Sequence, residues 1–80
     1  MTTIQADHFY ATTEAVNDAI DRSKSHNETV HVECTRTNTY IAICASLETE
    51  CEGATDSNEG MEFWGVDVEG ASWRVLVTKD

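Results

Sequence analysis

Five residues between positions 48 and 59 have the spacing of an EF-hand calcium loop. Glutamates stand at the first, third, fifth and twelfth positions of that pattern, and a glycine stands at the sixth: Glu48, Glu50, Glu52, Glu59 and Gly53. Glutamate is one methylene longer than the residues that the first three positions of this tight loop favour, and the flanking segments have the pattern of strands rather than helices. The stretch is therefore interpreted as a solvated acidic loop, with weak calcium binding as an alternative.

Thiol and imidazole side chains offer a second possible metal site. The donors are of the types that zinc prefers: His31, Cys34, Cys44 and Cys51. No C-x2-C pair is present, and the strand register expected below directs Cys34 and Cys44 to opposite faces of a sheet. We therefore interpret these two cysteines as buried, reduced thiols and Cys51 as exposed, and we expect neither a metal nor a cofactor.

Catalysis finds little support in the residue pattern. His8, His26 and His31 fall on a lead-in segment, a helix end and a strand, and no glycine-rich turn accompanies them to build an oxyanion site. Acid–base catalysis by a carboxylic acid needs a raised pKa, and hence a dry pocket that 80 residues can hardly enclose. The sequence therefore predicts a protein that is not an enzyme and has no catalytic residues.

The charge is high for so short a chain. The 80 residues include 15 Asp and Glu against 5 Lys and Arg, for a formal net charge of −10. This charge opposes direct binding to nucleic acid or to an anionic membrane, and it favours a basic partner, although it also suits simple solubility or adaptation to high salt. With no apolar run of signal-peptide or membrane-spanning length and an odd number of cysteines, we expect one soluble, cytoplasmic domain over residues 1–80.

The clearest helical pattern covers residues 12–27. Apolar residues from Ala15 to Ile20 form one narrow stripe, and Glu14, Asp18 and Asp21 form a second, negatively charged stripe. Thr12 or Thr13 is expected to cap the start of the helix, and Asn27 is a plausible left-handed stop. This helix should pack one face against the core and display acids on another.

Two hairpins are expected from alternating patterns, at residues 29–47 and 61–79. In the first, Val30, Val32 and Cys34 share one face, and the apolar run 40–47 forms the return strand. In the second, a two-residue turn at Gly70 and Ala71 would pair Val68 with Trp73 and Trp64 with Val77, which places both tryptophans in the core and Asp67 beside Arg74. With residues 48–60 as the acidic loop between the hairpins, the fold class is α+β, with one helix packed on a four-stranded antiparallel sheet.

Acidic residues are concentrated in one part of the chain. Residues 48–69 contain eight acids and no Lys or Arg. Carboxylates fixed about 6–7 Å apart on a folded surface approximate the field of a nucleic-acid backbone, so a basic groove that binds phosphates would also bind them. The carboxylates predicted to contact such a partner are Glu48, Glu50, Glu52, Asp56, Glu59, Glu62, Glu14, Asp18 and Asp21.

In length, charge and helix-plus-sheet pattern the chain resembles the small, acidic, often phage-encoded DNA-mimic inhibitors of the anti-CRISPR and anti-restriction class. The resemblance covers the whole chain without a shared motif, so no residue role is carried over. It implies a non-enzymatic inhibitor, acting in the host cytoplasm as a monomer, that occupies the basic groove of a nucleic-acid-binding complex such as a CRISPR effector. The alternative is an acidic protein-interaction module, in which Phe63, Leu76 and Tyr40 would share an outer sheet face that contacts a partner or a second copy.

Overall fold

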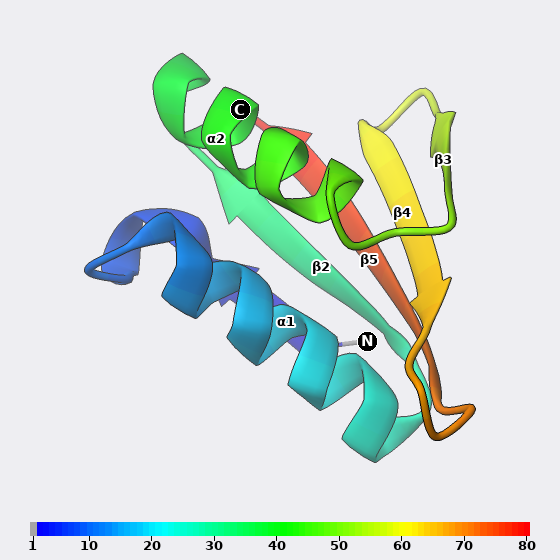
Figure 1. Cartoon of the computed structure of the whole chain (residues 1–80). Coiled ribbons are helices and arrows are strands. Elements are labelled where there is room, and N and C mark those ends of the chain that lie inside the picture. The colour runs from blue at the N-terminus through cyan, green and yellow to red at the C-terminus, as the bar shows by residue number, and fades with distance from the viewer. Residues whose placement is uncertain (1) are drawn as a thin grey trace.

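The computed structural model describes residues 2–80 and shows a five-stranded mixed sheet with two helices packed on one of its faces (Figure 1). The α+β class is confirmed, whereas the sheet has one strand more and the fold one helix more than predicted. The elements are β1 (Thr2–Gln5), a 3-10 turn η1 (Ala6–His8), α1 (Thr12–His26), β2 (Thr29–Cys34), α2 (Thr37–Glu48), β3 (Gly53–Asp56), β4 (Met61–Val66) and β5 (Ser72–Lys79).

The strand order is β1-β2-β5-β4-β3, and only part of the sheet is antiparallel. Strands β1, β2 and β5 run parallel, while β3, β4 and β5 alternate in direction. A parallel pair needs a crossover connection, and α1 supplies it between β1 and β2. The prediction of an all-antiparallel sheet is wrong because α2 replaces the hairpin that would have turned the chain back.

Helix α1 agrees with the prediction to within one residue. It buries its apolar stripe, including Ala15, Val16 and Ala19, and it ends at Asn27, whose φ of 51° is the left-handed stop that the sequence predicts. The N-cap position is Ala11 rather than Thr12 or Thr13, and no side chain caps this end. The helix is therefore held mainly by its buried face.

The hairpin predicted over residues 29–47 is wrong in its second half. Strand β2 does place Val30, Val32 and Cys34 on the buried face, but residues 37–48 form helix α2. Tyr40, Ile43 and Leu47 recur at helical spacing, and Ile43 and Leu47 are buried. A short apolar run fits both the helical and the strand periodicity. Packing against α1 and β5 favours the helix here.

The β4–β5 hairpin exists, but its register differs from the prediction. Residues 67–71 form a longer turn, so that Gly65 lies opposite Trp73 and Phe63 lies opposite Val75. A Cβ on Gly65 would stand 2.6 Å from the ring of Trp73, so this pairing depends on the glycine. The register differs from the predicted one by an odd number of residues, so side chains that are neighbours in β4 exchange sheet faces. Phe63 is therefore in the core, and Trp64 lies on the opposite sheet face.

The region predicted as an acidic loop, residues 48–60, contains the end of α2 and the edge strand β3. Strand β3 pairs with β4 alone, with Gly53 opposite Trp64. The predicted loop is therefore an ordered part of the sheet edge.

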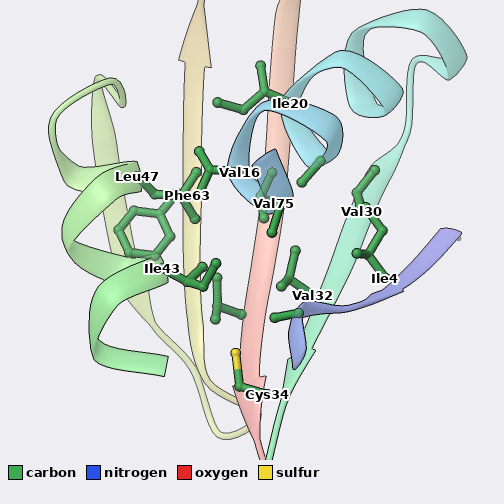
Figure 2. Close-up of a cluster of buried hydrophobic side chains, with 14 of the residues drawn as sticks. Ile4, Val16, Ile20, Val30, Val32, Cys34, Ile43, Leu47, Phe63 and Val75 are labelled. Carbon is green, nitrogen blue, oxygen red and sulfur yellow. The ribbon is translucent and has the colours of Figure 1, made fainter. Parts of the chain in front are cut away.

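The core fills the layer between the helices and the sheet. Figure 2 shows Ile43 and Leu47 of α2 on either side of Phe63, while Val16 and Ile20 of α1 lie over the sheet. Tyr40 packs against this core and Leu76 is 7% exposed on the opposite face, so the outer patch of Phe63, Leu76 and Tyr40 does not form. Across residues 2–80, neither helix has the length and apolar character needed to span a membrane.

Candidate functional site

Two acidic residues that the sequence did not single out connect separate parts of the fold. The carboxylate of Glu28 accepts hydrogen bonds from the backbone N–H of Thr2 at 3.0 Å and from the Thr2 hydroxyl at 2.6 Å. Asp7 accepts bonds from the N–H and the hydroxyl of Thr35. These bonds favour the ionised forms, so the pKa of each carboxyl lies below its ordinary value, chiefly because of the threonine hydroxyl. Both acids therefore serve the fold.

Asp67 organises the β4–β5 turn rather than pairing with Arg74. Its carboxylate accepts bonds from the backbone N–H groups of Glu69 and Ala71, both at 2.9 Å, and it lies 3.3 Å from the ammonium of Lys24. The Ala71 N–H contributes most to lowering the pKa of Asp67, and Lys24 adds to it. The predicted pair with Arg74 is wrong because the turn is longer than two residues.

The three acids predicted on α1 each have a structural reason for their position. Glu14 lies in the first turn, where the helix dipole favours an anion. Asp18 forms an ion pair with Arg22 at 2.9 Å, and Asp21 lies 3.9 Å from Lys24. Part of this charge is thus neutralised within the helix itself.

Glu62 lies on the sheet face opposite the helices, 3.7 Å from Arg74. Its side chain leaves β4 on that face, which separates it from the acids of residues 48–59. Glu62 therefore does not belong to the group of acids around β3.

The remaining predicted acids cluster around β3, and we call them the acidic edge. All five are exposed, and none has a salt-bridge partner among residues 2–80: Glu48, Glu50, Glu52, Asp56 and Glu59. No Lys or Arg occurs between Arg36 and Arg74 in the sequence. The acidic edge is therefore strongly negative, and the backbone that carries it runs along β3 and its neighbouring turns at the right of Figure 1.

Backbone hydrogen bonds fix the chain along the acidic edge. The N–H of Glu50 donates to Leu47 at 3.1 Å, and the N–H of Glu52 donates to the carbonyl of Trp64 at 2.8 Å. Beyond β3, the N–H of Ser57 donates to Gly60 at 2.8 Å. Gly60 is pressed against β5, where a Cβ would meet the Val77 carbonyl oxygen at 2.0 Å. The carboxylates are thus attached to an ordered backbone.

The position of Glu48 is unfavourable for the helix that carries it. It ends α2, where the dipole favours a cation, and α2 has no basic residue in its last turn. Misplacing one charge in this way costs about 0.3–1 kcal/mol. Proteins break such local rules at functional or strained sites, and Glu14, which suits its helix end, breaks none.

The metal-binding alternatives lose their geometric basis in the structure. The calcium-loop spacing is spread over a helix end, a turn, a strand and a second turn, so no continuous loop wraps a central point. Within residues 2–80, no three His, Cys, Asp or Glu side chains gather as a metal site. Cys34 and Cys44 both belong to the layer between sheet and helices rather than to opposite sheet faces. Burial raises the pKa of Cys34 to about 11 and also raises the pKa of Cys44.

Two clefts lie elsewhere on the molecule. One of about 250 Å³ lies beside Glu28, Trp73 and Arg74, and one of about 210 Å³ lies between η1 and the start of α2. Both are smaller than the roughly 300–1,000 Å³ typical of small-molecule sites, and neither is lined by the acidic edge. The acidic edge is therefore an exposed surface that belongs to neither cleft.

No protein-family model, curated protein sequence or solved structure matches this chain.

Proposed function

We propose that this protein is a non-enzymatic inhibitor whose acidic edge occupies the nucleic-acid-binding groove of a CRISPR effector or a similar defence complex. The observation that carries the proposal is the division among the acids. Most of those elsewhere hold hydrogen bonds, form ion pairs or suit a helix dipole, with Glu69 and Asp80 as exceptions, whereas the five acids of the edge lie together and are exposed without a salt-bridge partner among residues 2–80.

An ordered backbone makes these charges suitable for binding. A groove lined by Lys and Arg is already arranged for phosphates, so carboxylates attached to an ordered backbone release its counterions with a smaller loss of entropy than a flexible acidic tail. The hydrogen bonds at Glu50, Glu52 and Ser57 supply this order. Such binding carries no base-sequence information, and it blocks the groove whatever sequence the complex reads.

The proposal is tested by competition. A panel of purified CRISPR ribonucleoproteins and restriction complexes is mixed with labelled target DNA, and the fraction of bound DNA is measured as the protein is added. The variant E48Q/E50Q/E52Q should need at least about tenfold more protein for half-inhibition, equivalent to 1.4 kcal/mol of binding free energy. Inhibition should also weaken as salt rises.

The matched control is E14Q/D18N/D21N, which removes the same charge from α1. It should inhibit within a few-fold of the unmodified protein. An equal loss in both variants would show that only net charge matters. Full inhibition by the E48Q/E50Q/E52Q variant, or no inhibition of any complex in the panel, would contradict the proposal.

A further inference from the structure

The sheet face opposite the helices is open. Both helices contact β5 and each other, so they cover the same face (Figure 1). The other face, here called the open sheet face, carries the outward side chains of the strands, among them His31, Glu62, Trp64, Arg74, Leu76 and Thr78. No helix covers it within residues 2–80.

An open face is unusual for the parallel half of this sheet. Antiparallel sheets commonly leave one face in water, whereas sheets that are parallel throughout are found almost only with both faces covered. Here β1, β2 and β5 are parallel, and on the same outer face the apolar side chain of Val66 in the neighbouring β4 is 51% exposed. The strand arrangement thus indicates a second layer.

The charge on this face identifies what could form that layer. Its charged residues are Glu33, Glu62 and Arg74, so it carries about one tenth of the net charge of −10. Most of these groups are already paired within the face: Arg74 lies 3.7 Å from Glu62, and His31 bonds Thr78 at 2.6 Å. A polybasic groove gains little here, whereas another near-neutral face is complementary.

We infer that the open sheet face binds the same face of a second copy of this chain, which forms a two-fold symmetric dimer with the helices outside. Adjacent Glu62 and Arg74 suit such symmetry, because a two-fold rotation can bring opposite charges of the two copies together. Strands of four to eight residues, at about 3.3 Å per residue and about 4.8 Å apart, give two footprints totalling roughly 900 Å². That area is slightly below the roughly 1,000 Å² of a stable specific interface, so the dimer is weak and its dissociation constant is expected in the micromolar range or above.

This inference predicts an unusual response to salt. Two copies of net charge −10 repel each other, while their contact is nearly neutral. Raising sodium chloride from about 0.1 M to about 1 M shortens the Debye length from about 10 Å to about 3 Å and should strengthen the dimer. Binding through the acidic edge should weaken under the same change, so the two ideas succeed or fail separately.

The experiment is sedimentation velocity on the full chain over a hundredfold range of concentration at both salt levels. The unmodified protein should pass from monomer to dimer, with a larger dimer fraction at high salt. R74E should raise the dissociation constant of the dimer at least tenfold, because it places a second acid beside Glu62 at the centre of the open sheet face. R22E makes the same charge change and also removes an ion pair, but it lies on α1 and should dimerise normally.

A second pair of variants guards against loss of folding, which circular dichroism would detect. T3E adds a charge to the open sheet face at β1, and T13E adds one to the exposed first turn of α1, where an acid suits the dipole. Only T3E should weaken the dimer. A monomer under every condition would leave the face to solvent or to a different protein and would overturn the inference. So would equal effects of each variant and its control, or a dimer that weakens with salt.

Discussion

The two edges of the sheet use acidic side chains in opposite ways. At the β1 edge, Glu28 and Glu33 accept hydrogen bonds from Thr2 and Gln5, and so tie the outermost strand to its surroundings. At the β3 edge, Glu50 and Glu52 accept no hydrogen bond from residues 2–80, and backbone bonds hold the chain. Acids of the same chain thus differ in role, because folding gives some of them hydrogen-bond partners and leaves others exposed.

The edges also differ in their protection against unwanted strand pairing. Strand β3 has four residues, ends in Asp56 and is flanked by further acids, which discourages pairing with another strand. Strand β1 contains no charged residue. The acids at the β3 edge therefore serve stability against aggregation even in the absence of a partner.

The largest difference between the edges should come from the core beneath them. Phe63→Ala, opposite Ala54 of β3, should lower the free energy of unfolding by about 3–5 kcal/mol, and Ile4→Ala in β1 by about 2–5 kcal/mol, as measured by urea denaturation. Both side chains are buried, but Phe63 also supports β3, which has few other contacts. A loss below about 1 kcal/mol for Phe63→Ala would show that β3 is held independently of the core.

An intermediate effect is expected from Glu28→Gln, compared with Glu50→Gln at the opposite edge. The lowered pKa of Glu28 means that the folded state favours its ionised form, so its contribution is complete above pH 4.5, the ordinary pKa, and is lost as pH falls through the lower folded value. Glu28→Gln should therefore lower the Tm by a few degrees at neutral pH. The difference in Tm between the variant and the unmodified protein should disappear in acid. If thermal melts show the same difference in Tm at every pH, the effect of the substitution comes from side-chain packing rather than from charge.

The smallest effect should come from Glu50→Gln. Because this side chain is exposed and has no salt-bridge partner in residues 2–80, the free energy of unfolding should change by less than about 0.5 kcal/mol. The change should be towards greater stability at low salt, since it reduces repulsion near the end of α2. Chemical denaturation at two salt concentrations measures it, and a clear destabilisation would mean that the edge does hold the fold.

Features set by local sequence were predictable, and those set by distant contacts were not. Helix α1 carries its signals within its own residues, from the stripe at Ala15 and Val16 to the stop at Asn27. In α2, the spacing of Tyr40, Ile43 and Leu47 was an available signal for a helix, but the same short run also alternates like a strand. The parallel pairing of β2 with β5 depends on residues more than 40 positions apart and has no local signal.

The candidate site follows the same rule. The acids of the acidic edge are close in the sequence, so they were identified together. Their separation from Glu62, whose side chain leaves the opposite sheet face, required the register of β4. Asp67 had a visible signal, because an aspartate before a glycine-containing turn often binds the turn backbone. Glu28 had none, since its partner Thr2 lies 26 residues away.

Strand β5 lies between β2 and β4, although residues 2–71 precede it in the chain. During translation, the β1–α1–β2 unit and the β3–β4 pair leave the ribosome before β5, because they precede it in the chain. These two units are not hydrogen-bonded to each other as strands, and only β5 joins them in the sheet. The sheet can close only when residues 72–79 emerge. Assembly therefore depends on late, long-range contacts, which slow folding, and a chain cut before residue 72 would retain two separate strand pairs with exposed inner edges.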